Sequence, residues 1–343
     1  MKMTLSHRYL DANLDVLDKI GFPKADSLES LELAEGWMGN PTDRFPIEPF
    51  LTLLETAAIR LDDPFIGLRM GHRFRIATFA KTGSIYGYCR NLAQVIEMNA
   101  RYQHLAIDAG TVEYDHANAG HLMRFRPYYS DQNTFRHITD LVMGAYGTAY
   151  RWLSWASGED LMGTRLPYDR PHNTDLYERV FQCPVTFSSE CGTAALVFTE
   201  AAMSENLTTY DAEKLTRAQA QLDSLLNTKQ AAASLDMAVD AAIRGAIQSG
   251  RVSTLVVAER LDRDWPALRK ALKETDRNFW ARVDGVRQNM FIDLISQGHS
   301  LSQISQALAY NDQAAFNRAF KRWYNMSPTA WLKANPPQAA RPQ

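Results

Sequence analysis

The sequence predicts an α+β domain followed by an all-α domain that contains two helix-turn-helix units. Apolar residues recur with both helical and strand-like spacing up to about residue 226, whereas only helical spacing follows. The residues from Asp240 onward contain 15 Lys or Arg and 9 Asp or Glu, against 22 and 30 in the rest of the chain. We therefore expect an acidic α+β body, residues 1–226, a linker, residues 227–236, and a basic helical domain, residues 237–343.

The composition is that of a folded chain without a disulfide framework. With 343 residues, 45% of them hydrophobic, the chain can bury the cores of about two domains. Its three cysteines, Cys89, Cys183 and Cys191, form no CxxC pair, which argues against a zinc finger and for a reducing compartment. Charged residues interrupt the N-terminal segment, and no apolar run is long enough to span a bilayer. We expect a cytoplasmic protein with no membrane partner, no metal and no cofactor.

In the first 226 residues, helical and strand-like patterns alternate. Phe45-Pro46-Ile47 begins a helix that Asp62-Asp63-Pro64 ends. Between Thr111 and Arg126 the apolar spacing changes to two and flanks a turn at Asn118-Ala119-Gly120, which predicts a β-hairpin. The other predicted elements are helices over residues 92–105, 133–155 and 211–226 and strands within residues 183–198.

This part of the chain lacks the common catalytic motifs. It has no Gly-rich phosphate loop, no GxSxG elbow and no HExxH helix. His116 and His121 face each other across the proposed hairpin and are interpreted as a surface pair rather than a metal site. Cys183 and Cys191 are interpreted as buried, inert thiols rather than redox partners.

Aromatic residues are dense in the same region. At such spacing they are usually core, but they could also line an apolar pocket for a small molecule. The sequence singles out none of them as a ligand contact. The set comprises Phe79, Tyr86, Tyr88, Tyr102, Phe125, Tyr146, Trp152 and Trp155.

Residues 301–324 have the design of a helix-turn-helix unit. Leu301, Ile304 and Leu308 form the inner stripe of a short helix. The pattern then breaks, and Asp312 is placed to cap the next helix by accepting backbone N–H bonds, while Asn325 suits a left-handed cap at its end. The apolar face of that helix consists of Phe316, Ala319, Phe320 and Trp323. Its other face carries Gln313, Asn317, Arg318 and Lys321.

Residues 253–273 repeat this design more weakly. Leu255, Ala258 and Leu261 are expected to form a buried stripe, and Asp264 to cap a helix that begins at Trp265-Pro266. Leu268 and Leu272 anchor that helix, and its outer face carries Arg269, Lys270 and Lys273. A connecting helix, Phe279 to about Ser296, would fix the distance between the units, so that both second helices could enter successive major grooves of double-stranded DNA.

These segments resemble a known family. QALAYNDQAAFNRAFKRWYNMSP, residues 306–328, resembles the signature of the AraC/XylS family of bacterial regulators. Arg287 in DGVRQNM matches the arginine of that family's connecting helix, and the similarity extends upstream through VAERLDRDWPALRKAL. In the body, DPFIGLRMGHRF, NARYQHL and RVFQCPVTF are similar to the subgroup related to ornithine-utilisation regulators. That resemblance implies a non-cupin N-terminal domain that senses a small organic molecule and often mediates dimerisation.

Family position also implies roles for the outer-face residues. In the second unit, Gln313, Asn317 and Arg318 would contact base edges, because Asn and Gln pair with adenine and Arg with guanine. Arg269 and Lys270 occupy the matching face of the first unit. Lys321 and Lys273 are better placed for phosphate.

The chain departs from the family in both turns. Asp262 and Ala309 stand where the family usually has glycine, although the turn requires a left-handed backbone. Asp262 and Asp264 also bring negative charge near the phosphates. The first unit is therefore expected to bind DNA more weakly than the second.

The resemblance and the motifs together predict an effector-responsive activator. A small organic effector in the body would shift the dimerisation of a homodimer or the orientation of the DNA-binding domain, and the bound protein would recruit RNA polymerase. Two alternatives stay open. The body could bind a protein partner, or it could be an enzyme that the basic domain tethers to DNA. The enzyme requires an activated cysteine, and none of the three has an evident His or Lys partner in the sequence.

Overall fold

The computed structural model describes residues 3–34, 37, 44–76, 82–117, 120–129, 132–153, 161–273 and 279–335, with the backbone alone for 116, 117, 132–134, 232, 233 and 271–273. The chain divides into two compact units, Met1–Lys229 and Gln230–Gln343. Each unit has its own hydrophobic core. The first combines helices and strands, and the described part of the second is helical, which confirms the predicted fold class.

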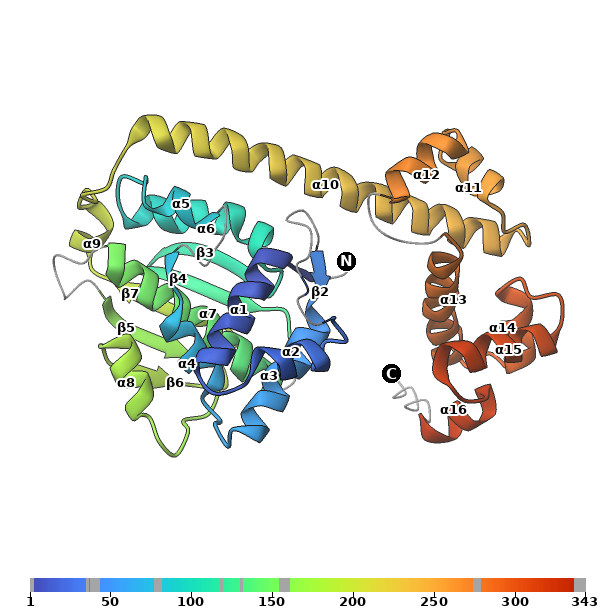
Figure 1. Cartoon of the computed structure of the whole chain (residues 1–343), viewed down its shortest axis with the longest axis horizontal. Coiled ribbons are helices and arrows are strands. Elements are labelled where there is room, and N and C mark those ends of the chain that lie inside the picture. Colours follow the sequence, from blue (N-terminus) through green and yellow to red (C-terminus); the bar gives the residue numbers. More distant parts are fainter. Residues whose placement is uncertain are drawn as a thin grey trace. The chain divides into compact units, whose positions relative to one another are not determined.

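The first unit contains a five-stranded sheet in the order β3-β4-β7-β5-β6 (Figure 1). Neighbouring strands are antiparallel except β5 and β6, which are parallel. A separate antiparallel pair is formed by β1 and β2. The strands are β1 (Thr4–Ser6), β2 (Arg44–Pro46), β3 (Gly110–Ala117), β4 (Gly120–Pro127), β5 (Leu161–Leu166), β6 (Val185–Phe187) and β7 (Ala194–Phe198).

The predicted hairpin is confirmed as β3 and β4. Val112 lies opposite Phe125 and Tyr114 opposite Met123, as alternation of the apolar residues requires. Two residues of the predicted turn, Asn118 and Ala119, lie outside the described residues. The strand region predicted within residues 183–198 corresponds to β6 and β7, whereas β5 was not predicted.

The helices of the first unit are α1 (His7–Lys19), α2 (Lys24–Ser30), α3 (Ile47–Arg60), α4 (Ile66–Arg73), α5 (Gly83–Tyr86), α6 (Leu92–Ala106), α7 (Gln132–Leu153), α8 (Asp175–Phe181) and α9 (Glu200–Ser204). Three predicted helices correspond to α3, α6 and α7. The predicted end of the last of these, at Trp155, lies outside the described residues. None of the described helices is both long enough and apolar enough to cross a membrane.

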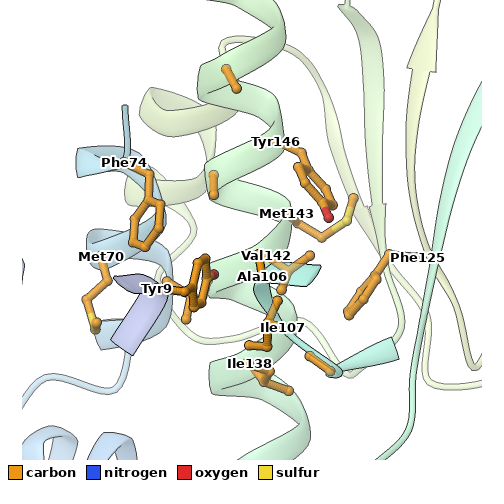
Figure 2. Packing of buried hydrophobic residues seen from close by; sticks show 14 of the residues in the cluster. Tyr9, Met70, Phe74, Ala106, Ile107, Phe125, Ile138, Val142, Met143 and Tyr146 are labelled. Carbon is orange, nitrogen blue, oxygen red and sulfur yellow. The ribbon is translucent and has the colours of Figure 1, made fainter. Parts of the chain in front are cut away.

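Two glycines bring α4 and α7 into backbone contact. A Cβ atom on Gly67 would lie 2.1 Å from the carbonyl oxygen of His137, and one on Gly71 would lie 2.5 Å from that of Leu141. Any side chain at either position would therefore push the helices apart. The buried core extends beside α7, where Figure 2 shows Tyr9, Val142 and Tyr146 among its members.

The tenth helix corrects the predicted linker. α10 runs without interruption from Ala212 to Gln248, so it continues through residues 227–236 instead of ending at Leu226. Residues 227–234 lack bulky apolar side chains, but residues 227–236 also lack glycine and proline, and their alanines have the highest helix propensity. Absence of a core face does not prevent a helix when nothing breaks it. The boundary between the two units falls within this helix.

The second unit consists of the last part of α10 and of α11 (Thr254–Arg260), α12 (Trp265–Lys273), α13 (Phe279–Ser296), α14 (Leu301–Ala307), α15 (Gln313–Tyr324) and α16 (Pro328–Ala334). The bounds of α13 are those predicted. Its Phe291 ring is fully buried, with its centroid 4.8 Å from that of Phe320 and 5.3 Å from that of Trp331. Both predicted helix-turn-helix segments pack on this core.

Candidate nucleic-acid interface

α14 and α15 form the second predicted unit. Ser300 caps α14 in a capping box with Gln303, and Ile304 and Leu308 are fully buried. Asp312 caps α15 by accepting a hydrogen bond from the Ala315 backbone N–H at 2.6 Å, as predicted. The predicted apolar face is also confirmed. Phe316, Ala319 and Phe320 are buried and Trp323 is half-buried.

Arg287 of α13 holds the turn between these helices. Its Nε atom donates a hydrogen bond to the Leu308 carbonyl oxygen at 3.0 Å. Its guanidinium carbon lies 4.3 Å from the centre of the Tyr310 ring, a cation–π contact. Ala309 between them has φ of 57°, the left-handed conformation expected of the turn. An arginine is suited to this place because its planar fork can donate and stack at once.

The outer face of α15 is fully open. Gln313, Asn317, Arg318 and Lys321 are all exposed. Within the described residues, no hydrogen bond or ion pair engages any of these four side chains. By contrast, the neighbouring Arg322 forms an ion pair with Asp284 of α13, with an N–O distance of 2.7 Å. The helix thus presents two amides, a guanidinium and an ammonium to solvent.

α11 and α12 form the first predicted unit, with one correction. Asp264 caps α12 by accepting from the Ala267 N–H at 2.8 Å, as predicted. Asp262 has φ of 51°, so this turn is left-handed as well. Leu255, however, is 71% exposed, and the buried residues of α11 are Val257 and Ala258. Four consecutive apolar residues, 255–258, allow several stripes, and only packing against α10 and α13 selects one.

The outer face of α12 carries fewer described groups than that of α15. Leu268 is fully buried, while Arg269 and Lys270 are exposed. The side chain of Lys273 lies outside the described residues. Asp262 in the turn and Asp264 at the cap of α12 are also exposed. The expectation that the first helix-turn-helix unit binds DNA more weakly stays a prediction.

A buried arginine fixes the position of α13, and the sequence reasoning missed it. Arg282 is only 6% exposed. Its Nε donates to Asp240 at 2.7 Å, and its other guanidinium nitrogens contact Asp236, both on α10. Burial opposes the charge, but the hydrogen bonds to Asp240 and Asp236 outweigh it and raise the pKa of Arg282. Its signal in the sequence was an arginine directly before Val283 on an otherwise apolar helix face.

In the compact unit Met1–Lys229, the interpretation of His121 as a surface residue is wrong. His121 is 7% exposed and therefore not a surface residue. Its Nδ1 accepts from the Tyr114 hydroxyl at 2.5 Å, and its Nε2 donates to the Glu200 carboxylate at 2.5 Å. The side chain of His116 lies outside the described residues. Among the described residues, no group of three His, Cys, Asp or Glu side chains is arranged to hold a metal ion.

The cysteines differ from one another in burial. Cys89 is buried, and burial raises its pKa to about 12. Cys183 is half-buried rather than buried as predicted, and desolvation also raises its pKa. The prediction that Cys191 is buried is wrong, because it is exposed in the segment between β6 and β7. Cys89 and Cys183 are thiols rather than thiolates at neutral pH and are poor nucleophiles.

Comparisons with known proteins agree with this architecture. A family model described as the arabinose-binding domain of AraC transcription regulator matches residues 21–207, and a helix-turn-helix domain model matches residues 257–334. Proteins described as uncharacterized HTH-type transcriptional regulators of Mycobacterium bovis and Mycobacterium tuberculosis are each 26% identical over 336 residues, 93% of this chain and 93% of theirs. The solved structure of the transcriptional regulator CdpR from Pseudomonas aeruginosa aligns with a TM-score of 0.47 and 16% identity over 95% of this chain and 98% of that one. Since the arabinose-binding model alone spans more than half of the sequence, the chain belongs to the AraC family of transcriptional regulators.

Proposed function

We propose that this regulator is an effector-responsive activator that reads two successive major grooves, with α15 as the principal recognition helix and α12 as the weaker one. The observation that carries the proposal is the free outer face of α15. Gln313, Asn317 and Arg318 are exposed and engage no other described residue, and their side chains have the donor and acceptor patterns that distinguish base pairs.

The contacts would divide between base reading and phosphate binding. We assign base edges to Gln313, Asn317 and Arg318 in α15 and to Arg269 and Lys270 in α12. Lys321 and Lys273 would contact phosphate, which adds affinity without sequence information. Both helix-turn-helix units pack on the core around α13, which supports a fixed spacing between α12 and α15.

The remaining parts of the proposal concern the compact unit Met1–Lys229. A small organic effector bound there would change dimerisation of a homodimer or the DNA-binding state, and the DNA-bound protein would recruit RNA polymerase. The charge of residues 1–239 supports a sensing role for this part of the chain. It contains 22 basic and 30 acidic residues, and this net negative charge would be repelled by DNA. The first unit is thus suited to sensing rather than to DNA contact.

The division of contacts predicts different effects for two substitutions in α15. We expect Arg318→Ala to lower discrimination at one base pair by about 1–3 kcal/mol, because guanine loses its bidentate partner. Lys321→Ala should weaken binding to all sequences and reduce the slope of log K against log salt by about 1. The measurement is a titration of the full chain with duplexes selected from a randomised pool, at several salt concentrations.

Arg322→Ala is the matched control, because it removes a positive charge from the same helix. Its guanidinium already pairs with Asp284, so the salt slope should stay close to that of the wild type. Equal, sequence-independent losses for Arg318→Ala and Lys321→Ala would show that α15 does not read bases as proposed.

A further inference from the structure

A small cavity lies inside the first unit, between α1, α5, α6 and α7. Its volume is about 10 Å³, room for about one water molecule. Apolar groups of Ala106, Ile107, Val142 and Ala145 form part of the wall, and Figure 2 shows Ala106 and Ile107 beside Val142 of α7. Polar side chains form the rest, from Tyr9, Thr82, Tyr86, Asn99, Gln103 and Tyr146. Small-molecule sites combine apolar and polar groups in the same way, but they are far larger than this cavity.

One donor in this wall has no partner among the described residues. The side chain of Gln103 is 5% exposed, and its Nε2 atom makes no hydrogen bond there. Its Oε1 accepts from the Tyr146 hydroxyl at a long 3.5 Å. A buried amide N–H that lacks an acceptor destabilises a protein. An acceptor oxygen in the cavity would satisfy it.

The wall also restricts the charge of a ligand. None of the residues that line the cavity is Asp, Glu, Lys, Arg or His. Burial raises the pKa of Tyr9, Tyr86 and Tyr146 far above neutrality, so these phenols stay uncharged. A charged ligand would lose its hydration without gaining a counter-ion. The cavity therefore favours an uncharged molecule.

α6 connects the cavity wall to α10. Asn99, Gln103 and Ala106 line the cavity from one face of α6. On the neighbouring face, the Tyr102 hydroxyl donates to Asp223 of α10 at 2.6 Å. At the end of α6, the Nζ atom of Lys229 donates to the His104 carbonyl oxygen at 2.5 Å and to Asp108 at 2.7 Å.

These contacts lead from the cavity to the helix that enters the second unit. Because the cavity holds only about one water, a larger molecule must displace part of its wall, to which α6 contributes Asn99, Gln103 and Ala106. Residues 212–229 of α10 follow α6 through Asp223 and Lys229, and α10 continues to Gln248. A displacement of α6 would therefore move residues 212–229 of α10 as well.

We propose that this cavity is the effector site, that it takes a small uncharged molecule whose carbonyl oxygen accepts from Gln103, and that α6 transmits its binding to α10. The proposal rests on the effector-responsive role proposed above. It adds the class of molecule, the recognising residue and the element that moves.

The test uses the full chain with acetamide and propionamide as neutral probes, and acetate and propionate as their charged counterparts. Saturation-transfer NMR should show transfer to the methyl groups of the amides and not to those of the carboxylates. Gln103→Met removes the donor at nearly constant volume and should weaken amide binding at least tenfold. The same change should raise the melting temperature by about 2–4 °C, because it removes a buried donor without a partner.

Two further variants keep the test decisive. Gln219→Met is the matched control, because Gln219 bonds the Met98 sulfur at 3.3 Å on the α10 side of α6 and lies outside the cavity. It should leave amide binding unchanged. Val142→Ala enlarges the cavity and should shift preference severalfold from acetamide to propionamide. Equal losses in Gln103→Met and Gln219→Met, carboxylates that bind as well as amides, or no transfer to either amide would overturn the site.

Hydrogen exchange with and without propionamide tests the transmission step. Residues 92–106 of α6 and 212–229 of α10 should change together, and a change confined to α6 would overturn transmission. A mobility shift with promoter DNA on the same samples separates this proposal from the preceding one. Retained DNA binding without amide binding refutes only the cavity, whereas loss of DNA binding by the wild type refutes the proposed function.

Discussion

At the scale of single residues, both helix-turn-helix turns contain a left-handed residue that is not glycine. Asp262 has φ of 51° and Ala309 has φ of 57°. The Cβ atom of an L-residue approaches the following carbonyl oxygen in this conformation, which costs about 1–2 kcal/mol for alanine and less for aspartate. Arg287 compensates by bonding the Leu308 carbonyl in the second turn. The turn geometry is thus imposed by its surroundings rather than by the residue.

We therefore expect Ala309→Gly to stabilise the compact unit Gln230–Gln343, which contains this turn. The relief of the left-handed backbone should exceed the loss of a half-buried methyl group, for a net gain of roughly 0.5–1 kcal/mol. Ala307→Gly removes a methyl two residues earlier, where α14 is still helical, and should destabilise by about 1 kcal/mol. Urea unfolding followed by circular dichroism measures both, and two changes of the same sign would contradict the backbone explanation.

At the scale of elements, the close contact of α4 with α7 is the strictest packing constraint in the first unit. The space at Gly67 and Gly71 is occupied by the backbone of α7, which cannot move as a flexible side chain can. Gly144 completes the contact, because a Cβ there would lie 3.4 Å from the Gly71 Cα atom. DPFIGLRMGHRF, one of the segments that resembles the family, contains both α4 glycines.

Gly71→Ala should destabilise the first unit by roughly 2–3 kcal/mol, because the added methyl overlaps the Leu141 carbonyl oxygen. Gly87→Ala is the control in the same unit. Its Cβ would meet its nearest atom, the Ser84 oxygen, at an ordinary 3.7 Å. Thermal unfolding of the two variants should differ clearly, and a tolerated Gly71→Ala would show that the helices can separate without cost.

At the scale of the whole molecule, one carboxylate joins distant parts of the first unit. Asp108 is 1% exposed and accepts from the Thr4 backbone, from Arg44 at 3.1 Å and from Lys229 at 2.7 Å. Burial disfavours its charge, but contact with His104 and the charges of Lys229 and Arg44 outweigh burial and hold the pKa of Asp108 below its ordinary range. Burial and the nearby Arg44 lower the pKa of Lys229, whereas the charge of Asp108 opposes this effect. Asp108 therefore favours the charged form of Lys229 beside Arg44.

The contacts of Asp108 predict that acid destabilises the compact unit Met1–Lys229. A carboxyl whose pKa is lower in the folded than in the unfolded state stabilises the fold above about pH 4, and this stabilisation is lost as the pH falls further. Asp108→Asn should therefore lower the free energy of unfolding by about 3 kcal/mol at pH 7, because it leaves two half-buried cations, Arg44 and Lys229, without their counter-ion. The deficit should shrink below pH 4 in urea unfolding experiments.

Asp115→Asn serves as the control for this prediction. Asp115 pairs with Arg124 at 2.9 Å, but both side chains are at least one-third exposed, so its loss should cost less than about 1 kcal/mol. A deficit of Asp108→Asn that is equal at pH 3 and pH 7 would show that shape, and not charge, makes the residue important.

The sequence by itself determined the fold class, the β3–β4 hairpin and the whole plan of the second helix-turn-helix unit. These features are encoded locally. The cap at Asp312, the Phe316 and Phe320 face and the left-handed Asn325 depend on residues within a few positions of one another, so periodicity and capping chemistry suffice to predict them.

Only the tertiary structure decided which residues of ambiguous segments are buried and which distant groups meet. Leu255 is exposed, and His121 is enclosed by Tyr114 and Glu200. The partners of Asp108 and the walls of the cavity come from segments far apart in the chain. Such contacts depend on how elements pack, and packing free energy is a property of the assembled core that no local pattern contains.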